Sequence, residues 1–183
     1  LTSLTLGDNV TRIGNEAFMN NALTSVSIPP KMKKIGDRAF ANNKIENIHV
    51  PYVEDMGAAV YEQNGSTTVT FEEGITTIPA DVLANTALTT VTIPTTVTRI
   101  EAGAFRNNQL TNITLPDSIT HIEAEAFDDN QLTSMSLPNS LTYIGESAFS
   151  NNKLTSIAFP NTITRIEAGA FDNNQLTSMS LSN

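Results

Sequence analysis

The chain has 183 residues and a formal net charge of −9, which argues against a nucleic-acid partner because nucleic-acid-binding proteins present a basic face. It has no cysteine, so a disulfide framework, a thiolate-ligated zinc site and a thiol nucleophile are all excluded. It has no run of about 18 apolar residues, so we expect no membrane insertion within this chain.

One pattern of residues recurs along the whole chain. Leu110–Gln131 reads LTNITLPDSITHIEAEAFDDNQ, and the next unit, LTSMSLPNSLTYIGESAFSNNK, begins 22 residues later. A fixed period of roughly 20–50 residues indicates one supersecondary unit stacked on itself. We therefore predict a single solenoid domain over residues 1–183, expected to be a fragment of a longer protein because the last unit is truncated. The units begin at Leu1, Leu23, Ile45, Ser66, Leu88, Leu110, Leu132, Leu154 and Leu176.

Each unit is named here by its first residue, and positions are counted from that residue. Positions 4 and 6, such as Ile113 and Leu115, are apolar and alternate with polar neighbours, which is typical of a half-buried strand. A proline such as Pro116 follows at position 7 and ends the strand, because it has no N–H for a ladder. Stacked in register about 4.8 Å apart, these strands predict a parallel sheet along one face.

The second half of each unit predicts the other sides of the coil. Thr120–Glu123 is expected to form a short extended segment opposite the main strand, and Ala124–Asp128 a single helical or 3₁₀ turn. Phenylalanine at position 18 is expected to close the core, and a pair of asparagines at positions 20 and 21 to satisfy turn backbone. The phenylalanines are Phe18, Phe40, Phe105, Phe127, Phe149 and Phe171.

Two motifs carry a resemblance to a known family. Leu1–Leu6 has the L-x-x-L-x-L opening of leucine-rich repeats. Pro138–Phe149 continues it as P-x-x-[VIL]-T-x-I-[GE]-x-x-A-F, which resembles the BspA-like class of bacterial surface antigens and some protozoan surface proteins. That class usually has one residue more per unit and Gly-Cys where this chain has Asn-Asn.

The resemblance implies a fold, a location and a kind of partner. The implied fold is α/β but mostly β: a solenoid or horseshoe with a parallel sheet on its concave face and short helical turns and strands on the other side. The implied protein is secreted or attached to the bacterial cell surface, adheres to host or other extracellular proteins, and has no catalytic residues.

The ionisable residues do not form a constellation for catalysis. His49 is at position 5 on the main strand and His121 at position 12 on the far side, so they cannot share a site. Carboxylates lie two residues from basic side chains in the later units, and we interpret them as surface ion pairs worth about 0–1 kcal/mol rather than acid–base pairs. We predict no enzyme, no metal site and no cofactor. The pairs are Arg99 with Glu101, His121 with Glu123, and Arg165 with Glu167.

The outward strand positions carry mainly hydroxyl side chains, among them Thr92, Thr114 and Ser136. They offer hydrogen bonds, but not the aromatic and arginine side chains that usually dominate interfaces. Threonine and serine also suit exposed strands for reasons unrelated to binding. The sequence leaves open whether this face is inert or a low-affinity polar contact surface.

One unit departs from the pattern and is our first candidate for a partner site. Ile45–Gly65 is one residue short after its proline, has Glu46 and His49 at outward positions, and brings in Tyr52 and Tyr61. The departure is explained either by structural drift or by partner recognition.

We therefore predict a monomeric, extracellular protein-binding module of a bacterial surface adhesin. The alternative is a structural spacer that presents another domain of the same surface protein. Binding of the isolated solenoid to extracellular proteins separates the two, because a spacer does not bind.

Overall fold

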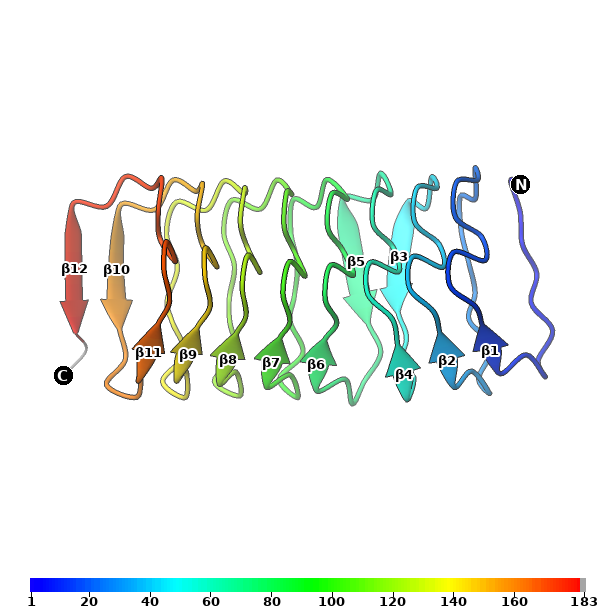
Figure 1. Cartoon of the computed structure of the whole chain (residues 1–183), viewed down its shortest axis with the longest axis horizontal. Coiled ribbons are helices and arrows are strands. Elements are labelled where there is room, and N and C mark those ends of the chain that lie inside the picture. Colours follow the sequence, from blue (N-terminus) through cyan, green and yellow to red (C-terminus); the bar gives the residue numbers. More distant parts are fainter. Residues whose placement is uncertain (182–183) are drawn as a thin grey trace.

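The computed structural model describes residues 1–181 as a row of stacked coils, one coil for each repeat unit (Figure 1). All regular elements in this range are parallel-paired β-strands, and the range contains no helix that could cross a membrane. In the Ile45 unit, residues after Pro51 are counted one position higher, so that Met56 corresponds to Ile78 and Ile100.

The first set of strands is a ladder of two-residue strands at positions 12 and 13, which confirms the predicted second extended segment. Except between the Ile45 and Ser66 units, each residue pairs with its counterpart in the neighbouring unit, as Ile100 does with Ile122. The inward residue at position 13 is buried in six of the eight strands, the exceptions being the half-buried Met56 and the exposed Ile166, while position 12 faces outward. The strands are β1 (Arg12–Ile13), β2 (Lys34–Ile35), β4 (Asp55–Met56), β6 (Thr77–Ile78), β7 (Arg99–Ile100), β8 (His121–Ile122), β9 (Tyr143–Ile144) and β11 (Arg165–Ile166).

The main strand at positions 3–6 is paired in only four units, so the predicted parallel sheet on this face is confirmed only in part. In the units between the two pairs, inward side chains such as Ile113 and Leu115 are still buried. A backbone bond at position 2 links some of the neighbouring coils there, as Thr133 N–H to Thr111 C=O at 3.2 Å and Thr89 N–H to Thr67 C=O at 3.1 Å do. Side-chain burial thus holds this face where the ladder is absent. The paired strands are β3 (Asn47–Val50) with β5 (Thr68–Phe71), and β10 (Ser156–Phe159) with β12 (Ser178–Leu181).

The predicted helical turn at Ala124–Asp128 is also wrong. Glu125 at position 16 has a φ of 56° and Asp129 at position 20 has a φ of 53°, and these left-handed residues interrupt a right-handed helix. The freed amides donate to the next coil: Glu125 N–H to Glu146 C=O and Phe127 N–H to Ala148 C=O, both at 2.8 Å. On this third side of the coil, hydrogen bonds between units therefore alternate with single-turn bonds along the chain, such as Asp128 N–H to Glu125 C=O at 3.1 Å.

Aromatic side chains at position 18 fill the core from this third side, as predicted. The rings of Phe105, Phe127 and Phe149 are completely buried and stack with successive centroid distances of 5.3 Å. Tyr61 and Leu83 take the same position in the Ile45 and Ser66 units.

Positions 20 and 21, which are both asparagine in most units, have different roles. Position 21 is buried, and Asn130 there accepts a bond from Leu110 N–H at 3.1 Å while its amide donates to the carbonyls of Phe105 and Phe127. Position 20 is exposed and left-handed, a conformation that asparagine tolerates better than most residues. The predicted structural role of the pair is confirmed.

Candidate protein-binding surface

The position 12–13 ladder is interrupted once, between β4 and β6. On one side β2 pairs with β4, and on the other β6 pairs with β7. Within residues 1–181 no backbone hydrogen bond joins residues 53–57 to residues 75–79. Figure 1 shows β4 and β6 visibly farther apart than neighbouring strands elsewhere in this ladder. The same two coils stay joined elsewhere, through β3 with β5 and through Ala59 N–H to Ala80 C=O at 2.9 Å.

Two departures from the repeat explain this ladder break. The Ile45 unit lacks one residue, so its turn has no counterpart of the bond from Ile119 N–H to Pro116 C=O at 3.1 Å. At position 14, where Glu101 N–H donates to Ile78 C=O at 3.0 Å, the Ser66 unit has Pro79, which has no N–H. The short unit was visible in the sequence analysis. The significance of Pro79 was missed, although its missing donor was a usable signal.

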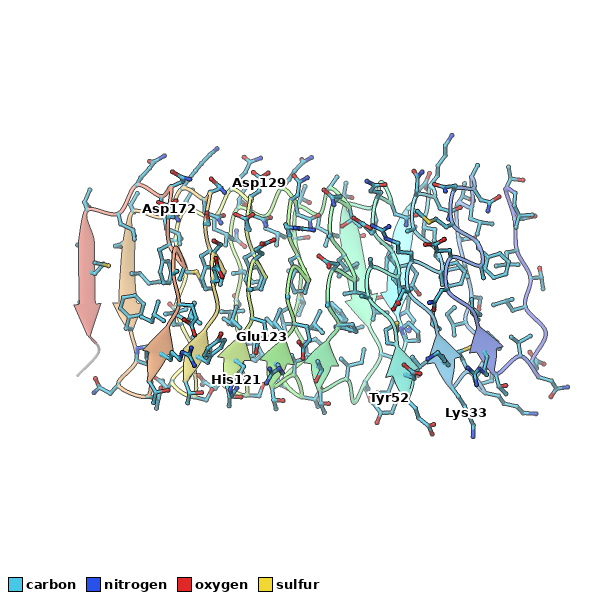
Figure 2. All side chains as sticks on the ribbon, viewed as in Figure 1. Lys33, Tyr52, His121, Glu123, Asp129 and Asp172 are labelled. Atoms are coloured by element: carbon cyan, nitrogen blue, oxygen red, sulfur yellow. The ribbon has the colours of Figure 1, made fainter. Side chains whose placement is uncertain are left out.

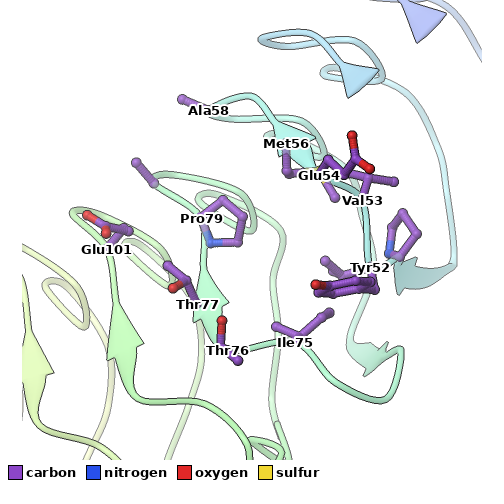
Figure 3. A pocket seen from close by; sticks show the side chains of 13 residues that line it. Tyr52, Val53, Glu54, Met56, Ala58, Ile75, Thr76, Thr77, Pro79 and Glu101 are labelled. Carbon is purple, nitrogen blue, oxygen red and sulfur yellow. The ribbon is translucent and has the colours of Figure 1, made fainter. Parts of the chain in front are cut away.

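A cavity of about 480 Å³ lies at the ladder break. Figure 3 shows Tyr52, Val53, Glu54 and Met56 on one side of it, and Ile75, Thr76, Thr77 and Pro79 on the other. Val53 and Met56 are half-buried, whereas their counterparts in the regular Leu88 unit, Val97 and Ile100, are completely buried. The break thus leaves apolar side chains uncovered that neighbouring coils cover elsewhere.

Tyr52 projects from the surface beside this cavity, and 59% of the residue's surface is exposed. Its backbone N–H donates to Glu72 Oε2 at 2.8 Å, which fixes the turn that carries the ring. The ring also lines a hollow of about 390 Å³ shared with Lys31 and Lys33. Figure 2 shows Tyr52 and Lys33 at the same edge of the stack, and Asp129 and Asp172 at the opposite edge. The Tyr52 ring therefore lies between the carboxylates of Glu54 and Glu72 and the basic side chains of Lys31 and Lys33.

The candidate contact residues of the Ile45 unit do not all lie at one surface in the structure. His49 is exposed on β3, with Nδ1 3.0 Å from Thr70 Oγ1, and it shares a hollow of about 210 Å³ with Tyr52. Glu46 is exposed one residue before β3.

Tyr61 is completely buried, so its side chain cannot contact a partner, and its proposed role as a contact residue is wrong. Its ring stacks on Phe40 at 5.8 Å, its hydroxyl donates to the His49 carbonyl at 3.2 Å, and burial raises the pKa of that hydroxyl far above its usual value. The missing residue shifts Tyr61 into position 18, where every unit needs a core side chain.

The hydroxyl-bearing candidates form one row with His49. Thr92, Thr114 and Ser136 are exposed at position 5 of consecutive units. Thr114 and Ser136 line a groove of about 350 Å³ between coils whose main strands are not paired. The row is continuous with His49 but lies on a different side of the coil from the ladder break.

The predicted surface ion pairs are present at two of the three places. Arg99 pairs with Glu101 at 3.0 Å and with Glu123 at 2.6 Å, and Arg165 pairs with Glu167. His121 instead bonds Thr120 Oγ1 through Nδ1 at 2.9 Å. In the described range no group of three or more histidine, aspartate and glutamate side chains is placed to hold a metal ion.

Charged residues also form a network near position 16. Arg106 pairs with Asp81 at 3.3 Å and with Glu125 at 2.8 Å. Partial burial raises the pKa of the Asp81 carboxyl above its usual value, and this effect outweighs the lowering by the Arg106 guanidinium. The folded state therefore holds a proton on Asp81 more tightly than the unfolded state does.

We expect the stability of the protein, relative to an Asp81→Asn variant, to fall as the pH rises from about 4. Below the pKa that Asp81 has in the unfolded chain, this carboxyl is neutral in both the folded and the unfolded state. The wild type and the Asp81→Asn variant then differ little in their free energy of unfolding. As the pH rises through the raised folded pKa, the carboxyl ionises in a poorly solvated site, and that cost appears only in the wild type. Urea unfolding of both proteins across the pH range measures the difference. A wild type that gains stability relative to the variant with rising pH contradicts the prediction.

Comparison with known proteins yields a family and a shared fold. The model of the BspA type leucine-rich repeat region matches residues 1–111 and 98–183. A leucine-rich cell surface protein from Faecalibacterium prausnitzii aligns with a TM-score of 0.66 at 21% identity, over 100% of this chain and 60% of its own. No curated protein matches the sequence.

Two further solved structures show the same fold. A leucine-rich repeat protein from Eubacterium ventriosum aligns with a TM-score of 0.57 at 24% identity, over 94% of this chain and 42% of its own. The pneumococcal vaccine antigen PcpA aligns with a TM-score of 0.52 at 19% identity, over 96% of this chain and 61% of its own. The chain thus spans less than two thirds of the length of these proteins.

Proposed function

Because the chain belongs to the BspA-type leucine-rich repeat family, we propose that it is the protein-binding module of a bacterial surface adhesin. In this proposal it acts outside the cell, as a monomer, on host or other extracellular proteins. Support comes from a structural neighbour that is a cell surface protein and another that is a vaccine antigen. Solenoids of this kind also offer extended surfaces suited to protein partners.

The observation that carries the proposal is the exposure of Tyr52 in the interior of the stack. The other exposed large hydrophobic side chains of the described residues, Leu1, Ile166 and Met179, lie in the end coils, where a neighbour is absent on one side. Tyr52 is exposed although coils lie on both sides of it. Tyrosine side chains that become buried when a partner binds are frequent anchors of protein interfaces. The hollows beside the exposed Tyr52 ring can accommodate side chains of such a partner.

In this proposal the exposed polar row supports the anchor. His49 shares a hollow with Tyr52, and the hydroxyls of Thr92, Thr114 and Ser136 continue the row of His49 at position 5, on the side of the coil next to the ladder break. Such groups are suited to the hydrogen-bonded, partly hydrated rim of an interface, which contributes less energy than its centre. Glu46 belongs to the same rim.

A structural spacer is the second candidate function, and the regular units favour it. From Leu88 onward the coils repeat the same buried asparagine and phenylalanine contacts with little variation in their outward hydroxyl face. Such a stack holds a neighbouring domain at a fixed distance without requiring any exposed anchor.

We expect a His49→Ala/Tyr52→Ala double variant to bind its extracellular partner at least about tenfold more weakly than the wild type. The measurement is binding of the chain to an immobilised panel of extracellular matrix proteins. The matched control is His121→Ala/Tyr143→Ala, which removes another histidine and tyrosine, 5.7 Å apart on the β8–β9 ladder. Full binding by the double variant excludes this surface, and no binding by the wild type favours the spacer.

A further inference from the structure

The ladder break leaves backbone acceptors of one coil without their usual donors. In regular coils the carbonyl at position 11 accepts an amide of the next coil, as Thr98 C=O does from Thr120 N–H at 2.9 Å. The carbonyl at position 13 does the same, as Ile100 C=O does from Glu123 N–H at 2.9 Å. The corresponding carbonyls of the Ile45 unit, on Glu54 and Met56, receive no backbone N–H from the next coil. All of these groups lie in the described part of the chain.

The facing edge also has an unused donor. Thr98 N–H donates to Thr76 C=O at 2.8 Å, but Thr76 N–H donates to no carbonyl across the break. Pro79 removes the second donor of this edge. The two edges therefore face each other across the cavity without being able to re-form the regular ladder. Paired backbone groups are the norm in a solenoid, so these groups favour an added strand.

The side chains around the break also lack the contacts that a neighbouring coil provides elsewhere in the stack. Val53 and Met56 are half-buried inside the stack, as though a coil were missing beside them. The cavity of about 480 Å³ is lined by these side chains, by Ile75 and by Pro79. A segment that takes the conformation of Val97–Ile100, in which the first and last side chains both point inward, covers both half-buried residues.

We propose that the ladder break is a slot into which an extended segment of a partner protein inserts as an additional strand between β4 and β6. The inference rests on the proposed protein-binding function and names its site and mode of recognition. The backbone of the segment pairs with the carbonyls of Glu54 and Met56 and with Thr76 N–H. Recognition by strand addition takes affinity from backbone hydrogen bonds and specificity from side-chain pockets.

The charge of the slot specifies the segment further. The charged side chains that line it are Glu54 and Glu101, and no lysine or arginine lines it. Glu101 is already paired with Arg99, whereas Glu54 is exposed and makes no ion pair within residues 1–181. The segment therefore carries a lysine or arginine beside an apolar-x-x-apolar pair, with its cation against Glu54.

The test selects short random peptides on the wild-type chain and counter-selects them on a repaired variant. The repaired variant carries a serine inserted between Tyr52 and Val53 together with Pro79→Glu, which restores the regular turn length and the position 14 donor. We expect enriched peptides with the stated pattern, binding the repaired variant at least about tenfold more weakly. On adding such a peptide, hydrogen exchange at Thr76 N–H should slow about tenfold. Peptides that bind both proteins equally, or leave this exchange unchanged, overturn the proposal.

A second variant tests the proposal without changing the backbone, so that a loss of peptide binding is not caused by misfolding. Glu54→Lys changes an exposed side chain and should weaken the selected basic peptides about tenfold. Glu146→Lys reverses another exposed carboxylate far along the stack and should leave them unchanged. If matrix proteins bind the wild type and the repaired variant equally, the slot fails while the proposed function stands. If the selected peptides bind in the slot but no matrix protein binds the wild type, the strand-insertion proposal is supported and the proposed adhesin function is contradicted.

Discussion

Replacing Asn130 by leucine is expected to lower the free energy of unfolding by about 3–5 kcal/mol. The change leaves the buried Leu110 N–H without a partner, at about 1–3 kcal/mol, and removes three further hydrogen bonds to carbonyls that keep another donor, at about 0.5–1.5 kcal/mol each. The Asn130 amide donates to the carbonyls of Phe105, Phe127 and Asp128 at 2.9, 3.2 and 3.3 Å. Its Oδ1 accepts from Leu110 N–H at 3.1 Å. Leucine fits the volume but makes none of these bonds.

Urea unfolding of the wild type and the variant measures this loss. Gln131→Leu is the matched control, because Gln131 is an exposed amide in the next position and its backbone bond to Leu110 C=O does not need the side chain. The control should change stability by less than about 0.5 kcal/mol. If the Asn130 variant unfolds at the wild-type urea concentration, the buried asparagines do not tie the coils together.

The sequence predicted the coil and its core because the pattern is repeated. Apolar residues at a fixed spacing can be buried only if the same face turns inward in every unit, and Ile100, Phe105 and Ile122 are completely buried at the predicted positions. The buried asparagine was predictable for a similar reason. An amide that can donate and accept is placed beside a turn in nearly every unit.

The third side of the coil was mispredicted because local propensity is weak over so short a segment. Alanine and glutamate favour a helix, but a five-residue turn gains little from that preference. Backbone bonds to the next coil determine the conformation instead, and they require left-handed residues such as Ala59 and Glu125, at 57° and 56°. Neither side chain signals a positive φ in the sequence.

The candidate site was predicted in part, from the length of one unit. The missing residue pointed to the Ile45 unit, where Tyr52 and the cavity lie. Tyr61 was predicted as a contact residue because the sequence does not show at which position of the coil the Ile45 unit lacks a residue. The structure places the missing residue before Tyr61, which therefore takes the buried position 18. Pro79 was overlooked because its effect depends on which amides join neighbouring coils. Pairing between coils is thus the information that the sequence pattern did not supply.

Replacing Phe127 by alanine is expected to lower the free energy of unfolding by about 3–5 kcal/mol, which combines lost burial with the cost of a cavity. The ring is completely buried and lies between Phe105 and Phe149, with both centroid distances 5.3 Å. Because the coils on both sides pack on this ring, relaxation of one coil cannot fill the space. The loss should therefore lie toward the upper end of the range.

Phe127→Leu is the matched control, since Leu83 already fills the same position in the Ser66 unit and is completely buried there. A smaller apolar side chain at position 18 is thus compatible with the coil, and the leucine variant should lose no more than about half as much as the alanine variant. Thermal and urea unfolding of the three proteins give the comparison. An alanine variant with an unchanged midpoint would mean that the phenylalanine stack does not hold neighbouring coils together. A leucine variant as unstable as the alanine variant would show that ring stacking, rather than filled volume, stabilises the third side of the coil.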